Sequence, residues 1–373
     1  MPSDAVDRWI ADRMRGIESS GIRKMFDLAR SLKDPVNLSI GQPDFDVPAP
    51  IKAAAKEAID RGFNGYTLTQ GIPELRNKIA ADIRKHYPDH DREVFVTSGT
   101  SGGLVLALCC TVNPGDEVVV FDPFFVLYPH LVALAGGTTV HVDTYPDFDI
   151  DPDKVRAVLT PRTKAILVNS PANPTGRIYS RERLRDLARL ARERNILLFS
   201  DEIYRAFCYD GEFTSPAEFN EDVLVFDGFS KSYAMTGWRL GYCHGPRRLI
   251  EEMIKLQQFT FVCAPSMVQH AGVVAWDYDV SSHVTAYRRK RDRVWEGLKD
   301  RFDLVKSEGA FYLFPRAPWG SGTEFVSECI RNNLLLIPGN IFSRADTHFR
   351  LSYAAADRTL DRGIEILNRL ARR

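Results

Sequence analysis

Five polar segments of the chain each follow a short apolar stretch, and each contains residue types that could bind or react with a small molecule. They are TSGTSGG (97–103), FDPFFVLYP (121–129), NSPANPTG (169–176), SDEIY (200–204) and DGFSKSYAMTGWRLGY (227–242). In an open parallel sheet, the carboxyl ends of the strands meet at one edge, and ligands bind there. We therefore expect the five segments to lie together.

The first segment could bind an anion. Gly99, Thr100 and Ser101 come just before the apolar run LVLALCCTV, which is expected to be helical. Small residues let backbone amides approach an anion, and the start of a helix adds unpaired N–H groups and the positive end of its dipole. Taken alone, such a segment is more often an ordinary turn. It is neither a GxGxxG nor a Walker sequence, so it does not indicate a dinucleotide or a nucleoside triphosphate.

The later segments contain an acid, a phenol and an amine at positions that folding alone does not easily explain. Asp201 follows an apolar strand directly, with Tyr204 three positions later, although Asp201 could equally cap a helix. Lys231 lies among Gly, Ser and Phe, where a lysine has no evident stabilising role, although single lysines often extend from buried stems. Phe124 and Phe125, taken alone, are most simply core residues, and NSPANPTG is most simply a loop.

Together the segments supply a phosphate-binding turn, an aromatic ring, an amide, a carboxylate, a phenol and an amine, which is the set that pyridoxal phosphate requires. The chain also resembles the fold-type-I pyridoxal-phosphate enzymes, specifically the class I/II aminotransferases. The resemblance extends over nearly the whole chain in the same order and spacing, through SIGQPDFDVP (39–48), YTLTQGIPELR (66–76), NPTG, SDEIY, SKSYAMTGWRLGY, GAFYLFP (309–315) and FRLSYA (349–354). It implies an enzyme that moves the amino group of an L-amino acid to a 2-oxo acid in ping-pong fashion.

By this resemblance, the catalytic residues are Lys231, Asp201 and Tyr204. Lys231 would bind the cofactor covalently and then move the substrate proton. Asp201 would face the pyridine nitrogen and keep it protonated. Tyr204 and Asn173 would form hydrogen bonds with the ring oxygen, and Phe125 would stack on the ring.

The resemblance also implies which residues bind the phosphate, namely Gly99, Thr100, Ser101, Ser230 and Arg239. Arg239 would supply the fixed cation that a closed phosphate site needs. Tyr66 resembles a tyrosine that reaches the phosphate of the neighbouring subunit, which implies a homodimer with shared active sites. One departure from the family pattern is Gly228, where many relatives carry a serine, and this puts that single phosphate contact in doubt.

Arg350 resembles the arginine that pairs with the substrate α-carboxylate, and Gly41 and Asn173 would assist it. Members that prefer dicarboxylates commonly place an arginine in the segment that here reads QQFTFVCAP (257–265). This segment has no cation and suggests an apolar pocket formed by Phe259, Phe261, Val262 and Cys263. Because an unpaired buried carboxylate is costly, we expect an aromatic or large apolar donor.

Three alternatives remain open. Aspartate would be preferred if an arginine of the N-terminal arm, such as Arg23, reached the site. A carbon–sulfur β-lyase would share nearly every residue named above. A ligand-sensing domain of a transcription regulator would need an attached DNA-binding domain, and the first ~40 residues are too short for one.

Composition limits the partners. The formal net charge of +0 argues against nucleic acid or an anionic membrane surface as a ligand. No apolar run approaches the roughly 18 residues that a membrane span needs. The first residues show no secretory signal and the six cysteines show no CxxC spacing, so we expect a cytoplasmic protein. No metal site is expected, because His86 and His90 flank Pro88, which interrupts the helix that their spacing would need.

These residues need a scaffold that brings strand ends together, and the apolar pattern predicts one. Strands are expected at 94–98, 117–122, 164–170, 195–201 and 223–228. Helices are expected after Gly71, with Ile72, Leu75, Ile79 and Ile83 on one face, and over 181–195, with Ser180 as its cap. Such alternation predicts an α/β fold, a mostly parallel sheet covered by helices on both sides.

The pattern changes after about Trp276 and predicts a smaller α+β domain. It should contain a basic, solvated helix over 286–302, short strands at 310–314, 334–338 and 349–353, and a final helix after Asp357. The expected domains are an N-terminal arm and part of the small domain (1–45), a large pyridoxal-phosphate-binding domain (46–275) and a C-terminal small domain (276–373).

Overall fold

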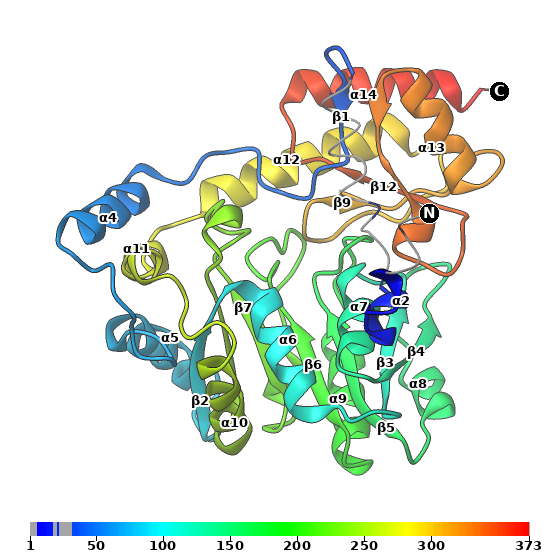
Figure 1. Ribbon diagram of the computed structural model, residues 1–373. Helices are drawn as coiled ribbons and strands as arrows, with labels where there is room; N and C mark the ends of the chain where they lie inside the picture. Colours follow the sequence, from blue (N-terminus) through cyan, green and yellow to red (C-terminus); the bar gives the residue numbers. More distant parts are fainter. Residues whose placement is uncertain (1–5, 18–20, 22–31, 373) are drawn as a thin grey trace.

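A seven-stranded, mostly parallel sheet forms the centre of the molecule (Figure 1). The computed structural model describes residues 6–17, 21 and 32–372. In space the strand order is β2-β8-β7-β6-β5-β3-β4. The bounds are β2 (Arg92–Thr97), β3 (Glu117–Asp122), β4 (Thr138–Asp143), β5 (Thr163–Asn169), β6 (Leu197–Asp201), β7 (Leu224–Gly228) and β8 (Gly241–Pro246). Only β8 is antiparallel to its neighbours, β2 and β7. The predicted α/β sheet is therefore confirmed.

Helices cover both faces of this sheet. One face packs against α6 (Gly99–Thr111), α7 (Leu127–Leu134) and α10 (Arg247–Gln258). The other face packs against α5 (Pro73–His86), α8 (Pro152–Val158) and α9 (Arg181–Glu193), while α4 (Ala49–Asp60) and α11 (Ser266–Trp276) lie outside α5. Because the strands have apolar neighbours on both sides, β3 and β5 are apolar along nearly their whole length rather than alternating.

Two of the helices predicted from sequence, α5 and α9, begin as expected. The apolar face of α5 is buried at all four predicted positions, Ile72, Leu75, Ile79 and Ile83. Ser180 caps α9, since its hydroxyl accepts a hydrogen bond from the backbone N–H of Arg183.

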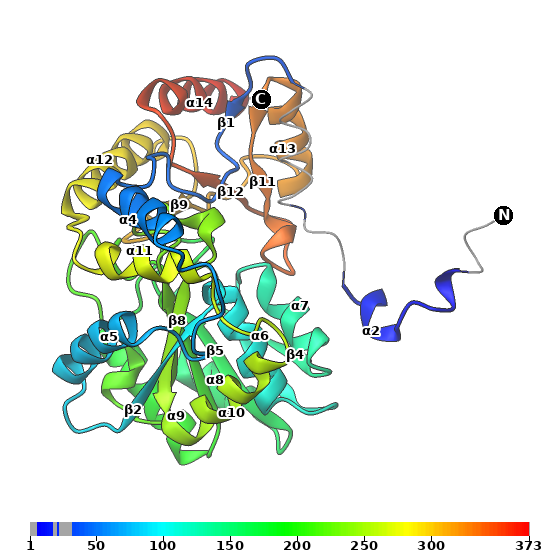
Figure 2. The ribbon, with the colours of Figure 1, turned by 60° about the vertical axis from the view of Figure 1, so that its left-hand side comes forward.

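A second, smaller assembly packs on the carboxyl-end side of the large sheet (Figures 1 and 2). Its strands are β1 (Val36–Asn37), β9 (Tyr312–Leu313), β10 (Leu334–Leu335), β11 (Ile337–Pro338) and β12 (Phe349–Ser352). Its helices are α12 (Ser281–Leu298), α13 (Gly322–Arg331) and α14 (Asp357–Leu370), and the short α2 (Asp12–Arg15) lies near the start of the chain. The strand β1 pairs with β10, and β11-β12-β9 form an antiparallel sheet.

The smaller assembly has the predicted α+β composition, and its strand β1 comes from near the beginning of the chain. The domain boundaries stay a prediction. Two details differ from the expectation. The strand expected at 334–338 is divided into β10 and β11, which belong to different sheets. The helix expected to be a solvated surface contains Arg291, which is buried. In the part of the chain that the structure describes, no helix has the length and apolar character needed to cross a bilayer.

Candidate active site

A cavity of about 280 Å³ lies at the carboxyl ends of the large sheet's strands, where the small assembly covers them. Eleven of the residues singled out from sequence line it, namely Gly41, Thr100, Ser101, Phe125, Asn173, Asp201, Tyr204, Ser230, Lys231, Arg239 and Arg350. They come from segments spread over more than three hundred residues of sequence. The sequence-based prediction that the strand-end segments lie together is therefore confirmed by the geometry.

Lys231 follows β7 and directs its amine into the cavity. Its Nζ donates a hydrogen bond to the carbonyl oxygen of Gly41 at 2.7 Å. Burial lowers the pKa of this amine to about 8, and the positive charges of Arg350 and Arg239 act in the same direction. An amine with such a pKa is unprotonated more often than an ordinary lysine, which suits a nucleophile and a proton carrier.

Asp201 ends β6 and is buried at the floor of the cavity. The hydroxyl of Tyr128 donates to its Oδ2 at 2.7 Å. Burial raises the pKa of Asp201 to about 6, against the opposing effect of the hydrogen bonds from Tyr128 and the Ile203 amide. Within the described residues this carboxylate has no ion-pair partner at contact distance. A cationic group of a ligand would supply that partner.

Two phenols and an amide line the wall between Asp201 and Arg350. The hydroxyls of Tyr204 and Tyr312 lie 2.8 Å apart. The side-chain oxygen of Asn173 accepts a hydrogen bond from Arg350 at 3.0 Å, so its amide N–H groups remain to donate into the cavity.

The first turn of α6 forms a cradle with the Arg239 side chain. Arg239 Nη2 donates to Ser101 Oγ at 3.0 Å, and Nη1 donates to the Thr236 carbonyl oxygen at 2.9 Å. A side chain at Gly241 would lie 2.6 Å from backbone atoms of Gly99 and Thr100, so the backbone segments touch. A cation beside amides at a helix start is an anion-binding arrangement.

The same packing accounts for Gly228, the departure from the family pattern. A Cβ there would lie 2.9 Å from Gly241 Cα and 3.0 Å from Thr100 Oγ1. This chain therefore has no room for the serine of many relatives.

Arg350 is buried in β12 and lacks a carboxylate partner among the described residues. Its Nη1 and Nη2 donate to Asn173 and to the Ser39 carbonyl oxygen, whereas its buried Nε has no partner. Its Cζ lies 4.6 Å from the ring centroids of both Tyr312 and Phe342. Burial lowers the pKa of the guanidinium. A buried, uncompensated cation with an unused N–H is suited to an anionic ligand.

Several residues expected at the site lie elsewhere in this chain. Tyr66 is 86% exposed and Phe259 is 83% exposed, and neither lines the cavity. Phe261 and Val262 are also exposed, so the expectation that this segment forms the pocket is not met within one chain. The apolar lining comes instead from Ile40, Leu104, Phe125, Leu127 and Ile203. Arg23 lies outside the described residues.

Sequence reasoning missed Tyr128 and Tyr312. Tyr128 follows Phe125 by three positions and lies in the first turn of α7, and its ring packs edge-on against that of Phe125. Tyr312 lies within the GAFYLFP motif, but its hydroxyl contact with Tyr204 joins positions 108 residues apart. A short-range pattern does not encode such a contact.

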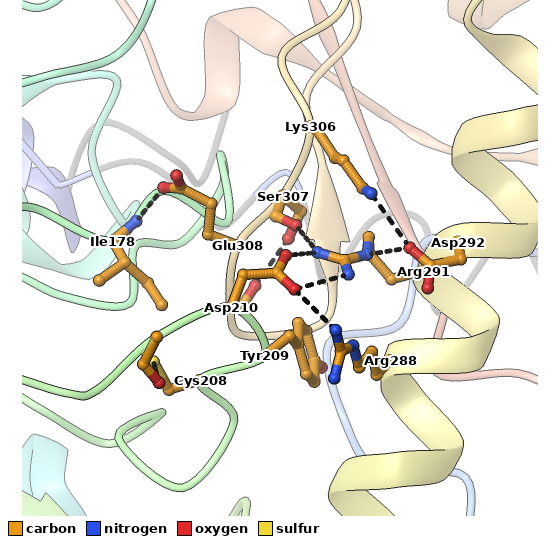
Figure 3. Close-up of polar contacts among 12 residues, drawn as sticks. Ile178, Cys208, Tyr209, Asp210, Arg288, Arg291, Asp292, Lys306, Ser307 and Glu308 are labelled. Atoms are coloured by element: carbon orange, nitrogen blue, oxygen red, sulfur yellow. Dashed lines mark hydrogen bonds and ion pairs between the residues drawn. The ribbon is translucent and has the colours of Figure 1, made fainter.

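A larger cavity of about 1010 Å³ is lined in part by Glu202, the residue that follows Asp201. Most of its charged groups are already paired, for example Arg205 with Asp227 at 2.6 Å and Arg177 with Glu308 at 3.3 Å. Figure 3 shows the adjoining cluster, in which Asp210 contacts Arg288 and Arg291 of α12. None of the residues predicted to be catalytic lines this cavity, so it is not the site of the chemistry.

The smaller cavity fits pyridoxal phosphate by the chemistry of its unpaired groups. It offers an amine with a lowered pKa, a buried acid without a cation, a guanidinium beside a tight glycine-containing turn, and a second, buried guanidinium. These match an aldehyde, a protonated pyridine nitrogen, a phosphate and a substrate carboxylate.

Comparison with known proteins identifies the family. Residues 33–367 match the family Aminotransferase class I and II, and the chain belongs to it. It is thus a fold-type-I enzyme, an aminotransferase that uses pyridoxal phosphate.

Several relatives are similar over nearly their whole length. The chain is 38% identical to the probable aspartate aminotransferase of Methanocaldococcus jannaschii, over 97% of this chain and 99% of that one. It is 35% identical to aromatic-amino-acid aminotransferase 2 of Thermococcus litoralis, over 97% and 98%. Among solved structures, aspartate aminotransferase from Thermus thermophilus with maleate superposes with a TM-score of 0.91 at 35% identity, over 97% and 99%.

Proposed function

We propose that this aminotransferase takes the amino group from an aromatic or large apolar L-amino acid and gives it to a 2-oxo acid. The observation that carries the proposal is the cavity lining. Within the described residues, the cations of the cavity are Lys231, Arg239 and Arg350. They are already assigned to the cofactor aldehyde, the phosphate and the substrate α-carboxylate, respectively. A second substrate carboxylate would find no cation there, and burying it unpaired would be costly. The apolar side chains of the lining favour an apolar substrate instead.

Each cavity residue has a role in this proposal. Pyridoxal phosphate, when bound, supplies an aldehyde that reacts with amines and a ring that withdraws electrons from the substrate. Thr100, Ser101, Ser230 and Arg239, with the turn at Gly99, would hold its phosphate, and Phe125 would pack against its ring. Asp201 would pair with the protonated ring nitrogen, while Tyr204 and Asn173 would donate hydrogen bonds to the ring oxygen.

The substrate is held and deprotonated by two groups. Arg350 binds the α-carboxylate beside Asn173, which fixes the substrate Cα relative to the amine of Lys231. Lys231 would accept the proton released from the substrate Cα and hold it on its Nζ. The lowered pKa of this amine, about 8, brings it near the working pH that efficient proton transfer requires.

We also propose that the functional unit is a homodimer with shared sites. Two exposed apolar segments lie side by side, since Gln257 donates to the Thr69 carbonyl oxygen at 2.7 Å. Their exposed side chains are Tyr66, Leu68, Phe259, Phe261 and Val262. Phe261 packs close to Gly102 of α6, beside the phosphate-binding turn. An exposed apolar patch at the rim of the cavity suits a second copy, whose own Tyr66 would reach the phosphate.

Donor preference tests the proposed function. With one 2-oxo acid as acceptor, we expect kcat/KM for phenylalanine to exceed that for aspartate by about tenfold or more, the order of discrimination that an apolar pocket provides. A large advantage for aspartate would reject the apolar donor. Release of pyruvate from cystathionine without any added 2-oxo acid would instead indicate β-lyase activity.

Subunit association needs its own measurement. Sedimentation should give twice the chain mass, and Phe259→Glu should shift the protein toward monomers that retain the cofactor less well. A monomeric wild-type enzyme with full activity would reject the shared site.

A further inference from the structure

Tyr312 lies between the part of the cavity assigned to the cofactor and the part assigned to the substrate carboxylate. It is buried in β9 and lines the cavity. Its hydroxyl is 2.8 Å from the hydroxyl of Tyr204, and its ring lies 4.6 Å from the Cζ of Arg350. The first neighbour belongs to the region assigned to the cofactor oxygen, and the second to the region assigned to the substrate carboxylate.

Tyr204 is the hydrogen-bond partner of the Tyr312 hydroxyl. Gly41 packs against this hydroxyl so closely that a Cβ at that position would lie 2.6 Å away. Among the described residues, its only hydrogen-bond partner is Tyr204. When Tyr204 donates its proton to an oxygen in the cavity, its own oxygen is free to accept one from Tyr312. Such a chain strengthens the donor at its end, because each hydrogen bond polarises the next.

The ring of Tyr312 also contacts the guanidinium of Arg350. The ring of Phe342 is a second contact, since the Cζ of Arg350 lies 4.6 Å from the centroid of each ring. Cations over aromatic faces are attracted by the ring quadrupole, and two rings leave the planar guanidinium little freedom to tilt. Phe342 is buried and does not line the cavity, so it contacts Arg350 without reaching Tyr204.

We propose that Tyr312 is a positioning residue with two separable actions, one on each neighbour. Its hydroxyl makes Tyr204 a stronger hydrogen-bond donor to the cofactor ring oxygen, and its ring orients Arg350 for the substrate carboxylate. The proposal rests on the proposed function, because it presumes the cofactor and the carboxylate in these places.

Three variants of the holoenzyme separate the two actions. Tyr312→Phe keeps the ring and removes the hydroxyl, Phe342→Leu removes a ring that does not touch Tyr204, and Tyr312→Leu removes both parts. One measurement is the pH midpoint of the cofactor's visible absorbance without substrate. The other is the KM for phenylalanine, together with the Kd of 3-phenylpropionate, which has the carboxylate but no amine.

For Tyr312→Phe we expect the midpoint to rise by about half to one pH unit, with KM and Kd changed less than about threefold. The direction follows because a weaker hydrogen bond from Tyr204 leaves the ring-oxygen anion less stabilised, so the chromophore keeps its proton to higher pH. For Phe342→Leu we expect KM and Kd to rise about fivefold or more with an unchanged midpoint. Tyr312→Leu should show both effects.

A double-mutant comparison provides an independent check. In a Tyr204→Phe background, adding Tyr312→Phe should leave the midpoint where Tyr204→Phe alone places it, since the hydroxyl acts through Tyr204. An unchanged midpoint in Tyr312→Phe, or an equal shift in Phe342→Leu, would overturn the inference. Failure of the proposed function itself is recognised separately, because the wild-type protein would then show no pH-dependent chromophore or no transamination of phenylalanine.

Discussion

Glu202, the residue after Asp201, provides a quantitative test of the electrostatics around the site. Its side chain is 2% exposed, and its Oε1 accepts hydrogen bonds from Ser200 at 2.8 Å and from Ser215 at 2.5 Å. Burial raises the pKa of Glu202 from 4.5 to about 7, although the two serine hydroxyls lower it. Ionising this carboxyl in the folded protein is therefore costly.

The magnitude follows from the difference in pKa between the unfolded and folded chain. A difference of about 2.5 units corresponds to roughly 3 kcal/mol, at 1.36 kcal/mol per unit. Between pH 4.5 and 7 the folded protein binds more protons than the unfolded chain. Stability consequently falls as the pH rises through this window, and the full cost is present above pH 7.

Replacing the carboxyl by an amide should remove this cost. In Glu202→Gln, the Oε1 atom can still accept from Ser200 and Ser215, because both hydroxyls donate to the same oxygen of Glu202. Urea unfolding of the cofactor-free protein at pH 5 and pH 8 would measure the effect. We expect the wild type to lose roughly 2.5 kcal/mol more than the variant between these two pH values, because part of the full cost is already present at pH 5.

An exposed acid at the same cavity serves as the control. Glu212 lines the larger cavity but is exposed, so Glu212→Gln should follow the wild-type pH dependence. Asp201 is present in the wild type and in both variants, so its contribution to the pH dependence of stability cancels in the comparison. If Glu202→Gln loses as much stability as the wild type between pH 5 and 8, the assignment of a raised pKa to Glu202 is refuted.

Three further predictions concern the cofactor cradle, the acid and the contact between the two parts of the molecule. Gly241→Ala should raise the cofactor Kd, followed by absorbance, at least ~10-fold, because the new Cβ would lie 2.6 Å from the phosphate-binding turn. Gly237→Ala should leave it unchanged, since no atom lies within 4 Å of its Cβ position, and equal effects would contradict the role of the turn. Asp201→Asn should lower kcat/KM for phenylalanine by about 10³. It should also raise the melting temperature of the cofactor-free protein at pH 8, because the buried carboxylate of the wild type is ionised at that pH. An active variant would contradict the role of the acid. Arg291→Ala should destabilise the protein to urea by about 2–3 kcal/mol, because it leaves the buried Ser307 carbonyl oxygen without its donor and removes one of the two arginines that contact Asp210. A change within error would contradict this expectation.

The sequence pattern predicted five strands of the large sheet but not β8 and β4, whose compositions are unusual for strands. The five predicted strands correspond to β2, β3, β5, β6 and β7, with ends that differ by a few residues at most. The strand β8, GYCHGP, contains two glycines and a proline, which weaken any strand signal. The strand β4, TTVHVD, lies at the edge of the sheet and is largely polar, so it lacks the continuous apolar run of the central strands.

The candidate site was predictable where each residue belongs to a strand end or a family motif. Asp201 ends a strand, Lys231 and Asn173 each follow one, and sheet topology alone brings them together. What could not be predicted is which side chains from distant segments complete them. Tyr128 reaches Asp201 across 73 residues, and nothing local in the sequence marks it as a partner.

The short parallel pairing of β1 with β10 joins the beginning of the chain to its last quarter. Just after β1, Ser39 and Gly41 accept hydrogen bonds from Arg350 and Lys231, so the substrate and cofactor regions share one N-terminal segment. A chain emerging from the ribosome therefore cannot assemble this site until about its 350th residue is available. A fragment that lacks residues 36–41 or the segment around Arg350 should accordingly form an incomplete site even where its central sheet folds.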